Sequence, residues 1–94
     1  MPSVVSVVIP TFGRLDDLRL VLSAVDGQEV PEGIELQVVV VDDGSPDGTW
    51  EWLHRDWECD ERRVAVRQAN AGPATARNRG VAAACGDLVV FLGD

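Results

Sequence analysis

An uninterrupted apolar run at residues 38–41 ends directly at two adjacent carboxylates, Asp42 and Asp43. A strand without polar alternation has both faces covered, which is typical of a parallel sheet with helices packed on each side. In such sheets ligands bind at the carboxyl ends of the strands, where the loops separate around a crevice. The junction therefore predicts a ligand site. An Asp-Gly-Ser turn that only caps the next helix is the competing interpretation, and position alone favours neither.

Strands and helices alternate along the chain. Apolar spacing, β-branched runs and turn residues predict, in order, a strand at 4–9, a helix at 16–25, a strand at 34–41, a short helix at 50–57, a strand at 64–66, a helix at 73–84 and a strand at 88–92. This alternation implies right-handed crossovers between parallel strands. The expected fold class is α/β, a Rossmann-like parallel sheet of about four strands with flanking helices.

The length and charge of the chain narrow its possible partners. Its 94 residues form one domain at most, and the formal net charge of −8 argues against nucleic acid or an anionic membrane surface as a partner. The charge leaves room for a phosphorylated ligand held by a metal ion or by backbone amides. Cys59 and Cys85 stand singly, which suits reduced thiols in a cytoplasm. No apolar run approaches the ~20 residues that cross a bilayer, so we expect no membrane span.

The last predicted strand is followed at once by Asp94, with no helix to cover it. One apolar face of that strand is expected to be poorly covered. We interpret the chain as the amino-terminal part of a longer protein. The alternative is that a partner chain covers the face, including self-association of this chain.

The segment after the first strand brings Pro10, Thr11, Gly13 and Arg14 to the same end of the sheet as Asp42. Proline lacks an N–H and glycine is flexible, so a tight loop here can offer the Thr11 hydroxyl and backbone to a ligand. Arg14 is expected to face either a phosphate or solvent.

A second loop, residues 70–80, follows the third strand. Gly72 permits close approach of the backbone to a ligand, and Pro73 is well placed to begin a helix. Arg77, one turn into that helix, is a candidate to point toward the crevice. The alanines of this segment are compatible with simple close packing on the sheet, and for Arg79 we expect a solvated side chain.

The fourth strand also delivers a carboxylate, Asp94, to its carboxyl end. Carboxylates gathered at neighbouring strand ends repel one another unless they meet hydrogen-bond donors or a cation. The sequence therefore suggests a divalent ion that also engages a diphosphate.

Taken together, these segments resemble the amino-terminal half of a family 2 glycosyltransferase with the GT-A fold. The resemblance rests on four segments in family order that cover nearly the whole chain: VSVVIPTF at 5–12, VVDDGS at 40–45, NAGPATARNRG at 70–80, and ACGD at 84–87 leading into FLGD at 91–94.

The resemblance implies that residues 1–94 are the nucleotide-sugar-binding part of an incomplete GT-A domain, which ends where the DxD-type motif begins. It implies that Pro10, Thr11 and Asp42 hold the base and ribose of a UDP-, GDP- or dTDP-linked sugar, and that Asp43 supports the loop. Gly72 and Arg77 would border the nucleotide. Asp94 would be the first acid of the motif that contacts the ribose and binds manganese or magnesium.

The implied reaction of the longer protein is sugar transfer with inversion to a hydroxyl of a glycan, lipid or small molecule. A carboxylate outside this chain would deprotonate that hydroxyl, so no catalytic residue is expected within it. We expect the chain alone to bind nucleotide weakly and to transfer no sugar. The implied location is the cytoplasm, or the inner face of the membrane through regions that this chain lacks.

Three other classes of protein share parts of this pattern. A phosphoacceptor signalling domain needs a lysine near a late strand end, and the chain contains no lysine. A dinucleotide-binding domain needs a G-x-G-x-x-G turn after the first strand, which residues 10–14 do not supply. An α/β interaction module without catalytic function remains the open alternative.

Overall fold

The computed structural model describes residues 3–93. Within them, one sheet contains the strands β1 (Ser3–Thr11), β2 (Ile34–Asp42), β3 (Arg63–Arg67) and β4 (Leu88–Phe91). Their order across the sheet is β3-β2-β1-β4, and each neighbouring pair is parallel. The predicted α/β fold with a Rossmann-like parallel sheet is therefore confirmed.

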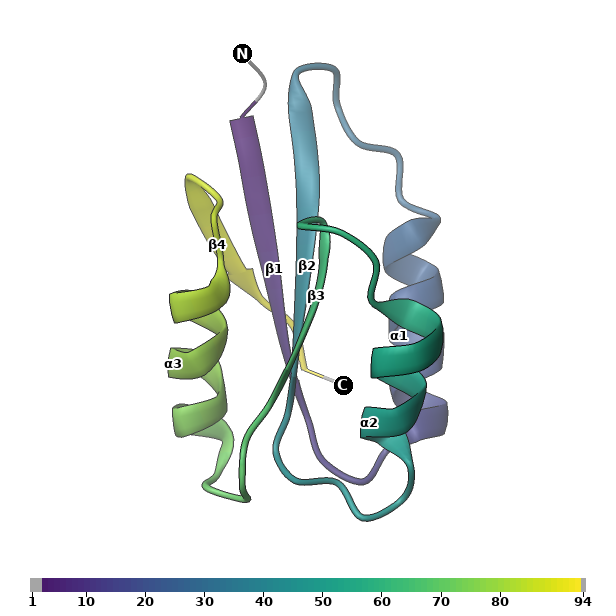
Figure 1. Ribbon diagram of the computed structural model, residues 1–94. Helices are drawn as coiled ribbons and strands as arrows, with labels where there is room; N and C mark the ends of the chain where they lie inside the picture. The colour runs from purple at the N-terminus through teal and green to yellow at the C-terminus, as the bar shows by residue number, and fades with distance from the viewer. Residues whose placement is uncertain (1–2, 94) are drawn as a thin grey trace.

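Helices cover both faces of the sheet (Figure 1). Helix α1 (Leu15–Asp26) and helix α2 (Thr49–Trp52) lie on one face, and α3 (Pro73–Ala83) lies on the other. Helix α2 continues directly into a π-helical turn, η1 (Leu53–Trp57). Each predicted element is present, although β1 extends beyond the predicted strand at both of its ends.

The apolar core consists of two layers, one on each face of the sheet. Because successive side chains of a strand point to opposite faces, the continuous apolar run of β2 supplies both layers. Val38 and Val40 belong to the layer beneath α1 and η1, with Val7, Ile9, Leu18, Leu22, Leu53 and Trp57. Val39 and Val41 belong to the layer beneath α3, with Val8 and Ala76.

Helix α3 approaches the sheet unusually closely at Gly80. A Cβ atom added there would lie 2.2 Å from Val8 Cγ1 and 3.3 Å from Val41 Cγ2. No side chain fits in that space, so glycine determines how near α3 lies to β1 and β2. Ala76, one turn earlier, is fully buried in the same contact.

Strand β4 presents apolar side chains to solvent. Leu88 is 59% exposed and Val90 is 39% exposed, and these two residues share one face of the strand. The predicted poorly covered face on the last strand is therefore confirmed. Within residues 3–93, no helix has both the length and the apolar character that crossing a bilayer requires.

Candidate functional site

The carboxyl ends of the parallel strands meet at one end of the sheet, where the segments after β1, β2 and β3 gather at the bottom of Figure 1. The strand register explains this meeting: Thr11 is paired with Asp42, and Asp42 with Arg67. Residues that are distant in the sequence thus lie side by side at this end, as the alternation of strands and helices predicted.

A cavity of about 340 Å³ opens at this end of the sheet. It lies between the segment after β1, Asp43 after β2, the first turns of α3 and Gly93, two residues beyond β4. Its lining residues are Pro10, Thr11, Phe12, Arg14, Asp43, Pro73, Arg77 and Gly93. Pro73 and Arg77 are four residues apart and share one face of the helix. The cavity therefore brings together residues from four separate segments that the sequence singled out.

Five of the predicted site residues line this cavity, namely Pro10, Thr11, Arg14, Asp43 and Arg77. Asp42 is fully buried and is not among the lining residues. Gly72 lies directly before α3 and also stands outside the lining. The predicted metal residue, Asp94, lies outside the described residues.

Asp43 holds the loop that precedes α3. Its Oδ1 accepts hydrogen bonds from Gln68 Nε2 at 2.8 Å and from the Ala71 N–H at 2.8 Å. Its Oδ2 accepts a hydrogen bond from the Gly72 N–H at 3.1 Å. One carboxylate therefore connects the end of β2 to three residues beyond β3.

These contacts also determine the charge of Asp43. Burial raises the pKa of Asp43, but the hydrogen bonds from Gln68, Ala71 and Gly72 outweigh that effect and keep its pKa below the usual value for an aspartate. The carboxylate is therefore ionised at neutral pH. With three donors already bound to it, Asp43 is poorly suited to accept a proton as a general base.

Gly72 and Gly44 are required for different reasons. Gly72 has a φ of +96°, which side-chain-bearing residues rarely adopt, and nothing lies within 4 Å of a Cβ added to it. The structure shows a requirement for backbone conformation at Gly72, and the predicted close approach of its backbone to a ligand stays a prediction. A close approach is found at Gly44, where an added Cβ would lie 3.0 Å from the Asn70 backbone nitrogen.

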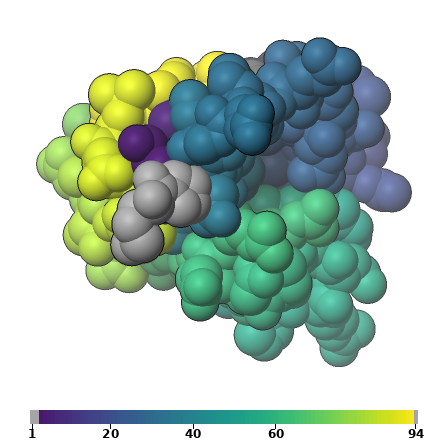
Figure 2. Space-filling view, turned by 90° about the horizontal axis from the view of Figure 1, so that it is seen from above, coloured from purple at the N-terminus to yellow at the C-terminus, as the bar shows by residue number. Residues whose placement is uncertain are grey.

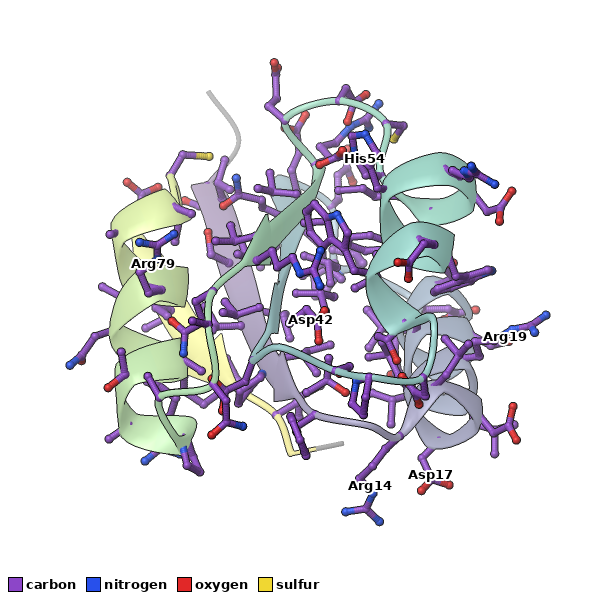
Figure 3. All side chains as sticks on the ribbon, turned by 60° about the horizontal axis from the view of Figure 1, so that its bottom comes forward. Arg14, Asp17, Arg19, Asp42, His54 and Arg79 are labelled. Carbon is purple, nitrogen blue, oxygen red and sulfur yellow. The ribbon has the colours of Figure 1, made fainter. Side chains whose placement is uncertain are left out.

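Asp42 points into the interior on the other side of the sheet. It continues the row of Val38 and Val40, which faces α1, and Figure 3 shows it among the elements and not at the outer surface. Its Oδ1 accepts a hydrogen bond from the Ser45 N–H at 3.0 Å. Its Oδ2 is buried and has no hydrogen-bond partner among residues 3–93.

Two guanidinium groups border the cavity. Arg14 Nη2 lies 3.3 Å from Asp17 Oδ2, and both side chains are half-exposed and project outward (Figure 3). Arg77 is exposed and makes no ion pair within the described part of the chain. Guanidinium groups are suited to bidentate contacts with phosphate oxygens. The cavity is therefore equipped for an anionic ligand although the protein as a whole is acidic.

The described residues do not by themselves fit a divalent metal ion. No group of three or more His, Cys, Asp or Glu side chains within residues 3–93 is placed to hold one. Among the described residues that line the cavity, Asp43 is the only carboxylate, and its oxygens already accept three hydrogen bonds. Any metal at this site needs ligands from outside residues 3–93.

A second cavity, of about 390 Å³, lies at the opposite end of the sheet, the end that faces the viewer in Figure 2. Its arginines are already paired: Arg62 lies 3.7 Å from Asp60, and Arg63 lies 3.1 Å from Asp26. Cys59, a free thiol, also lines this cavity. Arg77, which has no ion-pair partner among residues 3–93, therefore distinguishes the cavity at the carboxyl ends of the strands from this second cavity as the candidate ligand site.

Sequence reasoning missed two residues that shape this cavity. Gln68 donates to Asp43, and the Ser45 Oγ accepts a hydrogen bond from the Gly13 N–H at 2.7 Å. The sequence-based interpretation extends only as far as an Asp-Gly-Ser turn that caps the next helix. No local pattern indicated either of the longer contacts, because both depend on strand register and loop placement.

Comparisons of the sequence with known proteins indicate a family. The sequence model of the family described as glycosyl transferase family 2 matches residues 6–94. The glycosyltransferase AglE of Haloferax volcanii is 33% identical over 90 residues, which are 94% of this chain and 29% of that protein. The dolichol-phosphate mannosyltransferase of Pyrococcus furiosus is 35% identical over 88 residues, which are 94% of this chain and 24% of that protein.

A solved structure has a similar fold. The mannosyltransferase PcManGT from Pyrobaculum calidifontis, in complex with GDP-Man and Mn²⁺, matches with a TM-score of 0.79 and 28% sequence identity. The match covers 99% of this chain and 28% of that protein. The chain thus spans less than a third of the length of each of these three relatives.

Proposed function

This chain belongs to glycosyl transferase family 2, and we propose that the cavity at the carboxyl ends of its strands binds the nucleoside diphosphate of a nucleotide sugar. One observation carries the proposal: Thr11, Asp43 and the unpaired Arg77, from three separate segments, line a single cavity. Hydroxyl, carboxylate and guanidinium groups are the partners that ribose, base and phosphate need.

Each lining residue has a role in the proposed complex. Arg14 and Arg77 attract the diphosphate, because they are the cations at the cavity among the described residues. Pro10 and Thr11 border the base and ribose. Asp43 keeps the loop at residues 70–72 in place, and Gly72 supplies the positive φ that lets this loop turn into α3.

The whole protein, we propose, transfers the sugar with inversion to a hydroxyl group of a glycan, a lipid or a small molecule. The names of the relatives as glycosyltransferases and mannosyltransferases support this reaction class. The general base is proposed to come from outside residues 3–93, because Asp43 is held ionised by three donors with a lowered pKa. The 94-residue chain alone is accordingly proposed to bind nucleotide and transfer no sugar.

A divalent metal ion, manganese or magnesium, is proposed to accompany the diphosphate. The support comes from PcManGT, which was solved with GDP-Man and Mn²⁺. Such an ion would neutralise charge on the leaving diphosphate. Asp94 remains the predicted first ligand.

The protein is further proposed to work in the cytoplasm or at the inner face of a membrane. The support is chemical: Cys59 and Cys85 are both exposed free thiols, which persist in a reducing compartment.

Calorimetric titration with GDP-mannose, UDP-glucose and dTDP-glucose, with and without Mn²⁺, tests the proposed site. We expect at least one nucleotide sugar to bind, and Arg77→Gln to weaken that binding about 10-fold by removing one charged hydrogen bond. Arg79→Gln is the matched control, because Arg79 is an exposed arginine of the same helix that does not line the cavity. Absence of binding by the folded protein, or equal losses in both variants, would contradict the proposal.

An interaction module is the second candidate function, because β4 exposes Leu88, Val90 and Phe91. Apolar side chains gathered on an edge strand favour association, here proposed as self-association. Light scattering over a range of concentrations should then show dimers that Leu88→Lys disperses. A monomer at every concentration would remove this candidate and leave the nucleotide site unaffected.

A further inference from the structure

We propose that Asp42 is a positioning residue, which orders Ser45 so that Ser45 holds the backbone of Gly13 and thereby places Phe12 and Arg14 at the cavity. The role of this arrangement in ligand binding rests on the proposed nucleotide site. The arrangement itself is a property of the free protein, so it can be tested without a ligand.

Two hydrogen bonds link Asp42 to the segment after β1. Asp42 Oδ1 accepts from the Ser45 N–H at 3.0 Å, and Ser45 Oγ accepts from the Gly13 N–H at 2.7 Å. The first bond closes the turn that passes through Gly44 at a φ of +79°. This turn places the Ser45 hydroxyl against Gly13. Loss of the first bond is therefore expected to disturb the second.

Burial separates Asp42 from the cavity. Its side chain is fully buried, Ser45 is only 6% exposed, and neither residue is among those that line the cavity. Asp42 also faces α1, as do Val38 and Val40 of the same strand. A ligand in the cavity therefore meets the segment that Asp42 supports and does not meet Asp42.

The segment after β1 needs such support from another part of the chain. Gly13 has a φ of +63°, and Arg14, which precedes α1, makes no capping hydrogen bond with its side chain. The first turn of α1 is instead contacted by Asp47, whose Oδ2 accepts from the Leu15 N–H at 3.3 Å. Both Gly13 and Leu15 are thus held by the loop after β2.

Because Oδ2 of Asp42 has no hydrogen-bond partner among residues 3–93, a substitution there can distinguish a positioning role from direct contact with a ligand. In Asp42→Asn the amide keeps a carbonyl oxygen for the Ser45 N–H and places an NH₂ group where Oδ2 was. A positioning residue tolerates this exchange, because within residues 3–93 the carboxylate accepts a single hydrogen bond, through Oδ1. A carboxylate that accepts hydrogen bonds from the ligand through Oδ2 does not tolerate it, because an NH₂ group cannot accept.

The first measurement is the amide NMR signal of Gly13 in the free 94-residue protein. Ser45→Ala and Asp42→Ala should both shift this signal upfield and speed its hydrogen exchange, whereas Asp42→Asn should leave it near the wild-type position. Ser6→Ala is the matched control, since Ser6 is a fully buried serine whose hydroxyl bonds to Gln37, away from the cavity. An unchanged Gly13 signal in Ser45→Ala would overturn the proposal, even if Asp42→Ala fails to fold.

The second measurement is the affinity, by calorimetry, for whichever of GDP-mannose, UDP-glucose and dTDP-glucose binds the wild type. We expect Ser45→Ala to weaken binding about 2- to 10-fold, as the loss of one hydrogen bond allows, and Asp42→Asn to stay within about 2-fold of wild type. A loss of more than about 10-fold in a folded Asp42→Asn protein would show direct contact and overturn positioning. If the wild type binds no nucleotide, the proposed function fails, while the Gly13 signal still decides whether Asp42 positions this segment.

Discussion

The cavity has a first wall at residues 11–14 and a second wall at residues 70–77, and adjacent carboxylates support the two walls in different ways. For the first wall, Asp42 acts through the neutral hydroxyl of Ser45 on a single N–H, that of Gly13. For the second wall, Asp43 itself accepts three hydrogen bonds. Neighbours in sequence thus serve opposite faces of the sheet.

The two walls therefore differ in whether a charged or a neutral group accepts the hydrogen bonds that hold them. Hydrogen bonds to an ionised group are about twice as strong as those between neutral groups. The second wall is therefore expected to be the more firmly held and the more sensitive to pH. The first wall carries Arg14 and is expected to adjust more readily to a ligand.

The largest expected effect concerns how closely α3, the helix that carries part of the second wall, packs on the sheet. Gly80→Ala should lower the free energy of unfolding by about 3 kcal/mol, because the new methyl group overlaps Val8. Urea unfolding followed by tryptophan fluorescence measures this. Gly33→Ala is the control, with a φ of +84° and nothing within 4 Å of the new Cβ, and should cost only about 1 kcal/mol of strain. Equal losses in the two variants would mean that α3 does not depend on close packing at Gly80.

The second-largest effect is expected when a substitution removes the carboxylate that supports the second wall. Asp43→Ala should lower the free energy of unfolding by about 2 kcal/mol and expose the amides of Ala71 and Gly72 to hydrogen exchange. Asp87→Ala removes a carboxylate whose Oδ2 accepts one exposed hydrogen bond at 3.3 Å, from the Val4 N–H, and serves as the control with a much smaller loss. If exchange at residues 71–72 stayed slow, another contact would have to hold this wall.

A third, smaller effect is the response of the second wall to acid. Because hydrogen bonding lowers the pKa of Asp43 in the folded state, its stabilising contribution is fully present above about pH 4, the ordinary aspartate range, and is lost as pH falls through the lower folded pKa. Asp47, whose pKa is also lowered, through hydrogen bonds from Thr49 and Leu15, acts in the same direction.

Urea unfolding between about pH 6 and pH 3 measures this response. Asp43→Asn should reduce the acid dependence and leave the part that Asp47 contributes, and Ser45→Ala should leave the slope unchanged because Ser45 holds Gly13 through a neutral hydroxyl. A flattened slope in Ser45→Ala instead would remove the electrostatic difference between the two walls.

The smallest effect concerns Arg14 at the first wall. Its ion pair with Asp17 is half-exposed at both ends, so Asp17→Asn should change the free energy of unfolding by less than about 0.5 kcal/mol. The same change releases the guanidinium and should tighten nucleotide binding slightly, most clearly at low salt. Weaker binding in Asp17→Asn would indicate that this pair orients Arg14 toward the ligand.

Much of the fold could be predicted because its signals are local. The apolar run before Asp42 has no polar alternation, and the helical spacing of Leu18 and Leu22 marks α1. The position of the site followed from topology, since parallel strands place their carboxyl ends together. The exposed face of β4 followed from the absence of a helix after it within this chain.

The partners of the two carboxylates could not be predicted in the same way. Gln68 reaches Asp43 because β3 lies next to β2 in a particular register, and Ser45 reaches Gly13 across two loops. No spacing of residues in the sequence predicts either contact. The close approach of the Gly72 backbone to a ligand stays a prediction, because it depends on where a ligand lies and not on a neighbouring segment of the chain.

The sequence by itself determined the order of the elements, the buried character of β2, the end of the sheet that carries the site and, through its motifs, the glycosyltransferase family. Only the tertiary structure decided which groups each of the two carboxylates binds. The physical reason is side-chain alternation combined with register: Asp42 continues the row that faces α1, whereas Asp43 leaves the strand toward the loop before α3. One step along the chain therefore separates a residue buried behind the cavity from one that lines it.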